Sequence, residues 1–166
     1  MQTLAQNFQM INYLVPKTRS NDSSLSKSNC KFISMKGYSK VTFVVTAGAM
    51  TEATTIFKAY QAKNVAGSSV SATALAIAHF WTNVASVSAA TLVRTAATSS
   101  QVVLTATANV IQMFEVDAKQ LNANSNFDCI GLAVTGISAA TCINIKAILH
   151  DARYAADGMP IAATAN

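Results

Sequence analysis

From Cys30 onward, the chain is made of short segments in which apolar and polar residues alternate, separated by loops rich in Ser, Ala and Thr. Alternation over about four to eight residues is typical of β-strands that bury one face. The only helical signal is a single turn over residues 117–121, capped by Asp117. The sequence therefore predicts an all-β protein with eight or nine strands. The clearest segments cover residues 41–46, 54–60, 74–82, 91–94, 101–105, 110–116, 127–134 and 141–150.

Short antiparallel strands bury their apolar faces most readily in a β-sandwich. We expect a jelly-roll-like sandwich, with an immunoglobulin-like one as the alternative, because the chain lacks the Cys-Trp-Cys framework of immunoglobulin domains. Pro16 and the polar run over residues 18–24 interrupt any element that continues from the N-terminus. We therefore predict an N-terminal arm over residues 1–28, a β-sandwich domain over residues 29–154 and an extended C-terminal arm over residues 155–166.

The low share of charged residues, 11% against 51% apolar residues, indicates a protein that assembles with other chains. An average domain has about 25% charged residues, so this surface is covered mainly by uncharged polar residues and Ala. Such a surface is often buried in part by partners. The most apolar stretch, residues 65–81, contains Ser, Thr, Gly and His and predicts no membrane-spanning helix. The first residues lack the pattern of a signal peptide, so we expect synthesis in a cytoplasm.

The net charge of +5 lies in the first 40 residues, where six basic side chains stand against one acidic one, Asp22. This basic segment is interpreted as a docking element for an acidic partner, and the alternative is a solvated leader. Nucleic acid is the less favoured partner, because its binding sites interleave aromatic residues with many more cations. The candidate docking residues are Lys17, Arg19, Lys27 and Lys31.

The titratable residues are too few and too scattered to predict an enzyme. His79 shares a parity with Ile77 and Trp81, and we expect it at the rim of the core. His150 stands beside Asp151, a pair that could orient an imidazole, but no Gly-x-Ser-x-Gly motif and no evident partner accompany it. We therefore assign no catalytic or cofactor-binding residue and expect a non-enzymatic protein.

Metal sites are not predicted either. The two histidines and three cysteines lack the spacing of zinc ligands. Glu115 and Asp117, at positions i and i+2 of a strand, could hold Ca²⁺ together with Asp128, although two exposed acids and a helix cap is the favoured interpretation. Trp81 could stack on a sugar, but a lone Trp in a sandwich belongs more often to the core.

The three cysteines are odd in number, far apart and set among alternating apolar residues. Isolated cysteines of this kind behave as small apolar side chains. We expect Cys30, Cys129 and Cys142 to be buried free thiols.

Three stretches of the sequence resemble segments found in a group of small tailed-phage virion proteins. They are Ile-Ser-Met-Lys-Gly-Tyr-Ser-Lys-Val-Thr-Phe (33–43), Glu-Val-Asp-Ala through to Phe-Asp-Cys (115–129) and Ile-Leu-His-Asp-Ala-Arg-Tyr (148–154). In that group, an apolar-Ser/Asn-Met-Lys-x-Tyr segment leads the first core strand, an E-V-D-A turn precedes a Phe-Asp strand, and the closing strand ends in Ala-Arg-Tyr. The resemblance covers residues 30–154, and the Ala/Ser-rich middle matches only in pattern.

The resemblance implies a decoration or cement protein on the outer surface of a tailed-phage head, located on the virion and bound to the major capsid protein. Closed symmetry is the norm for homo-oligomers, so we expect a homotrimer or a homodimer. The alternatives are another virion component, such as a head-fibre base or a tail accessory protein, and a carbohydrate-binding β-sandwich module.

Overall fold

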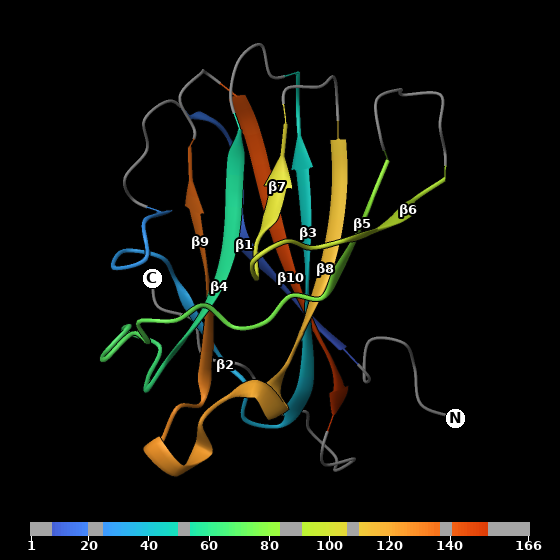
Figure 1. The fold of residues 1–166 in the computed structure, drawn as a ribbon. Helices are drawn as coiled ribbons and strands as arrows, with labels where there is room; N and C mark the ends of the chain where they lie inside the picture. Colours follow the sequence, from blue (N-terminus) through green and yellow to red (C-terminus); the bar gives the residue numbers. More distant parts are fainter. Residues whose placement is uncertain are drawn as a thin grey trace.

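The computed structural model describes residues 8–19, 25–49, 54–83, 91–105, 110–136 and 141–152. These residues form ten β-strands and two single-turn 3₁₀ helices, and they contain no helix long and apolar enough to cross a membrane. The strands make two antiparallel sheets, of six and four strands, packed as a sandwich (Figure 1). The elements are β1 (Phe8–Arg19), β2 (Phe32–Ser34), β3 (Tyr38–Ala47), β4 (Thr55–Ala62), β5 (His79–Thr82), β6 (Val93–Ala96), β7 (Val102–Leu104), β8 (Val110–Asp117), η2 (Ala118–Gln120), η3 (Ala123–Ser125), β9 (Cys129–Thr135) and β10 (Thr141–Ala152).

The strand order is that of a jelly roll. One sheet has the order β1-β10-β3-β8-β5-β6, and the other has the order β2-β9-β4-β7. The first strand pairs with the last, and the pairs β2 with β9, β3 with β8 and β4 with β7 are nested inside that pair. Nested pairs describe one long hairpin that is rolled up, which is the arrangement of double-sheet jelly rolls. The jelly-roll prediction is confirmed, and the immunoglobulin-like alternative is not observed.

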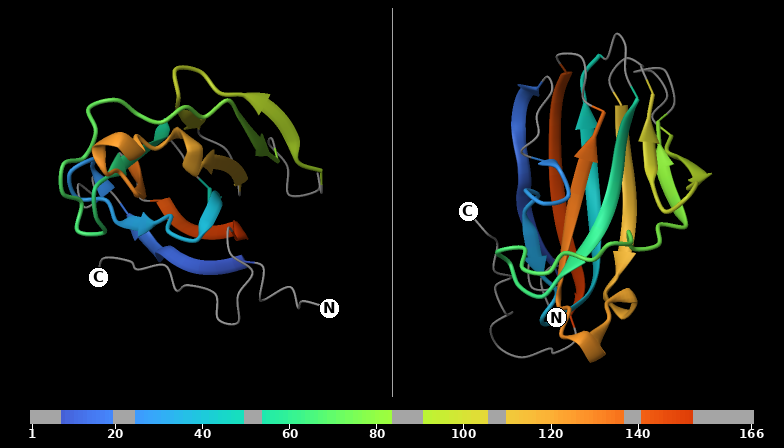
Figure 2. Two further views of the ribbon diagram at one scale, coloured as in Figure 1. Left: turned by 90° about the horizontal axis from the view of Figure 1, so that it is seen from below. Right: turned by 60° about the vertical axis from the view of Figure 1, so that its left-hand side comes forward.

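The hairpin of β5 and β6 is inserted between β4 and β7 and adds two strands to one sheet. β5 pairs with β8, and β6 pairs with β5. Because the other sheet has only four strands, the six-stranded sheet extends beyond it at this edge (Figure 2). The residues of β6 are accordingly exposed or half-buried.

The inward residues of both sheets build one core. In β10 the buried positions alternate from Ile143 to Leu149, as the sequence predicts. Phe114 lies in the middle of this core, with its ring centroid 5.6 Å from that of Phe43 in the same sheet and 6.4 Å from that of Phe57 in the opposite sheet. Aromatic rings therefore connect the two layers across the sandwich.

The predicted N-terminal arm over residues 1–28 is wrong for residues 8–19. They form β1, an edge strand of the six-stranded sheet, and pair with β10. Tyr13 of this strand is 2% exposed and belongs to the core. Pro16 does not prevent pairing, because an edge strand leaves one side of its backbone without a partner strand. The predicted C-terminal arm over residues 155–166 lies outside the described residues.

The single helical turn predicted after β8 is confirmed as η2. Asp117 caps it, and its Oδ1 accepts a hydrogen bond of 2.9 Å from the Lys119 amide. Burial by itself would raise the pKa of Asp117, but hydrogen bonds from the Lys119 amide and ammonium outweigh it and lower the pKa. The turn therefore directs the chain from β8 towards η3 and β9 with the Lys119 N–H group satisfied.

Candidate functional site

The described parts of the three stretches that carry the virion-protein resemblance, residues 33–43, 115–129 and 148–152, come together through strand pairing. Lys40, in the first stretch, is paired with Asp117 on one side and with His150 on the other. Ser34 is paired with Cys129 in the second sheet. Segments distant in the sequence thus form one structural unit, built from the starts and ends of neighbouring strands.

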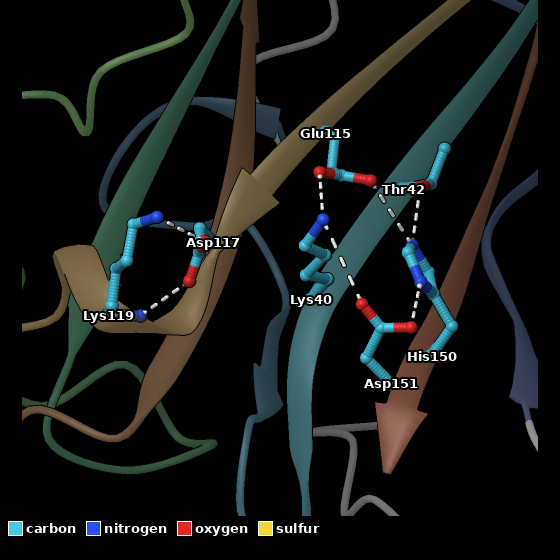
Figure 3. Close-up of polar contacts among 7 residues, drawn as sticks. All are labelled: Lys40, Thr42, Glu115, Asp117, Lys119, His150 and Asp151. Carbon is cyan, nitrogen blue, oxygen red and sulfur yellow. Dashed lines mark hydrogen bonds and ion pairs between the residues drawn. The ribbon is translucent and has the colours of Figure 1, made fainter. Parts of the chain in front are cut away.

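Five polar residues of this unit form a cluster on the outer face of the six-stranded sheet, called here the polar cluster: Lys40, Thr42, Glu115, His150 and Asp151 (Figure 3). Lys40 Nζ lies 3.1 Å from Glu115 Oε1 and 3.8 Å from Asp151 Oδ2. The hydrogen bond to Glu115, together with its negative charge, raises the pKa of Lys40. The ammonium group therefore links β8 to the end of β10.

His150 is contacted through both ring nitrogens. Its Nε2 lies 2.9 Å from Thr42 Oγ1 and 3.5 Å from Glu115 Oε2, and its Nδ1 lies 3.5 Å from Asp151 Oδ1. The sequence shows only the Asp151 neighbour. Thr42 and Glu115 reach the imidazole because the sheet register sets Thr42 opposite both Ile148 and Glu115, two residues along the strands from the pair Lys40–His150 and on the same face of the sheet.

The backbone of Asp151 has the left-handed conformation, with φ at 55°. The ladder to β3 keeps its register from the pair His150–Lys40 to the pair Ala152–Tyr38, with Asp151 between them. The left-handed backbone conformation accompanies the contacts of the Asp151 carboxylate with both His150 and Lys40.

Thr42, His150 and Asp151 stand in the order of hydroxyl, imidazole and carboxylate that nucleophilic catalysis uses. The polar cluster differs from a nucleophilic catalytic site in two features. The Nε2 atom is shared between the hydroxyl and the Glu115 carboxylate, and both carboxylates are already within ion-pair distance of Lys40. The arrangement is that of a charge-compensated network that ties three strands together.

The carboxylates considered for Ca²⁺ are each paired with a lysine of their own. Lys40 contacts Glu115, Lys119 contacts Asp117 at 3.0 Å, and Lys36 contacts Asp128 at 3.1 Å. In the part of the chain that the structure describes, no group of three or more His, Cys, Asp or Glu side chains is arranged to hold a metal ion. The ammonium groups occupy the positions that a cation would take.

Two of the three cysteines match the prediction of buried free thiols. Cys30 and Cys129 are buried and unpaired, whereas Cys142 is exposed, so the prediction is wrong for Cys142. Cys142 lies next to the buried Ile143 in β10 and faces outward by strand alternation. Burial raises the pKa of Cys30 to about 11, and burial with the Asp128 contact raises the pKa of Cys129 to about 12.

We expect one of the three thiols to react quickly with a thiol reagent in the native protein. At pH 8, pKa values of about 11 and about 12 leave the thiolate fractions of Cys30 and Cys129 at or below about one in a thousand, and both thiols are shielded. Ellman's reagent should therefore give one fast equivalent before denaturation and three after it. The variant Cys142→Ser should lose the fast phase, and a second fast equivalent in the wild type would contradict the burial of the other two.

The candidate docking cations lie along β1 and the segment that follows it. Lys17 and Arg19 belong to β1, and their side chains fall outside the described part of the structure. Lys31 is exposed just before β2. Lys27 Nζ lies 5.2 Å from the ring centroid of Tyr60 and donates a hydrogen bond of 3.4 Å to the Ala72 carbonyl. The structure therefore gives Lys27 a local structural role as well.

Trp81 is on the surface and not in the core. Its exposed fraction is 38%, whereas the neighbouring Phe80 is 9% exposed and faces inward. Strand β5 begins only at His79, so the parity of the buried residues Leu75 and Ile77 does not carry over to it. His79 lies at the rim of the sheet, as expected, with its Nδ1 3.1 Å from a terminal nitrogen of Arg94.

Comparisons with known proteins give little to set beside this geometry. Neither a protein-family model nor a curated protein sequence matches the chain. The crystal structure of the SPBc2 prophage-derived protein YomS is similar to this chain with a TM-score of 0.47 and 10% sequence identity, over 87% of this chain and 94% of that chain. A likeness of this strength bears on neither the fold nor the function.

Proposed function

We propose that the protein is a structural component of a tailed-phage virion and that it binds the outer surface of the head as a decoration or cement protein. The observation that carries this proposal is that strand pairing brings together the described parts of the three stretches that resemble small virion proteins. Motifs that meet in one place belong to one part of the sandwich, so the resemblance concerns how the strands are assembled rather than scattered strands.

The character of the described surface supports a binding role. The cluster richest in titratable groups is a charge-compensated network on an open sheet face. Exposed large apolar side chains occur on both edges of the six-stranded sheet, at Met10 and Val15 on one edge and at Trp81 and Val93 on the other. A protein with two such edges is suited to contact two neighbouring subunits of a shell.

The proposal is tested by adding the purified protein to undecorated heads of a tailed phage and measuring co-sedimentation. We expect saturable binding at a fixed number of copies per head, and a cryo-EM map with added density on the outer shell. Binding that never saturates, or density only on the tail, would contradict a decoration role. The second outcome would favour a tail accessory protein.

We also expect the binding to weaken as ionic strength rises from about 0.05 to about 0.5 M, because screening shortens the reach of the docking cations. The double variant K27Q/K31Q should show a reduced association rate and a flatter salt dependence. The control K58Q/K63Q removes two cations from β4 and the residue after it, and includes a lysine over an aromatic ring, as Lys27 is, with Lys63 Nζ 5.9 Å from the Phe127 ring centroid. Equal losses in both variants would mean that net charge, and not this segment, governs binding.

A further inference from the structure

Exposed apolar side chains concentrate where the six-stranded sheet extends beyond its partner layer. In the part of the chain that the structure describes, four of the six large apolar residues that are more than a third exposed lie on or directly beside β5, β6 and β8. They are Trp81, Leu92, Val93 and Ile111, with exposed fractions of 38%, 37%, 53% and 41%. A concentration of this kind on one part of a surface indicates a contact with another molecule.

The sheet register places three apolar side chains in one line across the outer face. Trp81 is paired with Met113, and Met113 is paired with Val44. Each lies between two buried neighbours on its own strand, so all three point away from the core. We call this line the outer row.

A cation stands at each end of the outer row. Arg94 is paired with Trp81 on β6, and Lys146 is paired with Val44 on β10. Strands are about 4.8 Å apart, so the four steps from β6 to β10 set the two cations about 19 Å apart. Within the described residues neither cation has a carboxylate partner, and Glu115, the carboxylate next to Met113 along β8, is paired with Lys40 and His150.

A second copy of the chain is a poor occupant of this surface. Two copies could pack face to face about a two-fold axis parallel to the strands, which sets Arg94 of one copy over Lys146 of the other. With a two-fold axis perpendicular to the strands, Arg94 lies over Arg94 of the other copy and Lys146 over Lys146. Both arrangements bring like charges together. A nucleic acid is not favoured either, because one aromatic ring and two cations fall short of the usual footprint.

We propose that the outer row is a docking surface for a protein face that is apolar in the middle and carries carboxylates on both sides, about 19 Å apart. Trp, Met and Arg are the residue types enriched in the cores of protein interfaces, and a central aromatic side chain commonly dominates the affinity. The inference rests on the proposed function. It takes the partner face to belong to one shell subunit and the edge of the sheet at β1 to contact the neighbouring subunit.

The test uses the full chain and undecorated heads, with dissociation constants from co-sedimentation. Trp81→Ala should weaken binding by roughly 10-fold to 100-fold. The charge reversal R94E/K146E should weaken it by at least about 10-fold and reduce its salt dependence. Val103→Ala, a half-buried apolar position on the outer face of the four-stranded sheet, and K58E/K63E serve as matched controls, and thermal unfolding checks that all variants are folded.

The outcomes separate this inference from the proposed function. Tight binding by the wild type and equally tight binding by Trp81→Ala and R94E/K146E would overturn the outer row as a docking surface and leave the decoration role intact. No binding by the wild type would overturn both. Self-association that is lost in Trp81→Ala, or binding to single-stranded DNA that is lost in R94E/K146E, would overturn the assigned partner.

Discussion

Deletion of residues 1–19 is expected to abolish cooperative folding, although the sequence alone suggests that this segment is dispensable. The deletion removes β1 and exposes the full length of β10, which would become an unprotected edge strand. It also removes two buried side chains, Tyr13 and Leu14. Circular dichroism during heating should show no sharp transition for the truncated protein.

The hydroxyl of Tyr13 explains much of this dependence. It accepts a hydrogen bond of 2.7 Å from the Leu132 amide, and it lies 2.5 Å from the Lys31 carbonyl and 3.0 Å from the Leu132 carbonyl as a donor. The bonds join the edge strand β1 of one sheet to β9 and to the residue before β2 in the other sheet. Tyr13→Phe leaves these groups without their partner and should lower the free energy of unfolding by about 1–3 kcal/mol.

Two controls bracket the effect of β1. Deletion of residues 1–7 removes no residue of this strand and should leave the unfolding transition in place. Val15→Ala, at a side chain 57% exposed, should change stability by no more than about 0.5 kcal/mol. A truncated protein that lacks residues 1–19 and still melts cooperatively near the wild-type temperature would show that β1 is only loosely attached.

The second large effect is expected at Phe114, where Ala should lower the free energy of unfolding by about 3–5 kcal/mol. The ring is fully buried and contacts aromatic rings of both sheets, at Phe43 and Phe57, so its removal opens a cavity between the layers that surrounding strands cannot readily fill. Urea unfolding monitored by fluorescence measures the change.

Ile111→Ala on the same strand is the matched control for this prediction. Its side chain is 41% exposed on the outer face, and its loss should change stability by less than about 1 kcal/mol. Similar large losses at Ile111 and Phe114 would mean that the outer face of β8 is covered by another molecule or by another part of the chain.

The alternation of apolar and polar residues predicted most of the fold because it shows which side of a strand is buried, and most strands here bury one side only. The segments at residues 41–46, 110–116 and 141–150 became β3, β8 and β10 with the predicted parity. β1 escaped prediction because two register shifts and Pro16 interrupt its alternation. An edge strand tolerates such irregularities, since only one neighbour must match it.

The candidate site was predicted only where its residues are adjacent in the sequence. His150 and Asp151 were paired from the sequence, but Thr42 and Glu115 come from other strands, and register alone decides that they meet the imidazole. Trp81 was assigned to the wrong face because a strand boundary, which parity does not reveal, lies between it and Ile77. Side chains brought together by long-range pairing leave no local pattern to read.

The pairing of the first strand with the last has a consequence for how the protein is made. β1 leaves the ribosome well before its partner β10, so the six-stranded sheet cannot close until β10 has been synthesised. Until then β1 and β3 both lack the strand that lies between them, and their open edges are available for wrong pairing. Contacts between such distant segments slow folding, commonly to milliseconds or seconds. The growing chain is therefore open to misfolding until β10 inserts between β1 and β3.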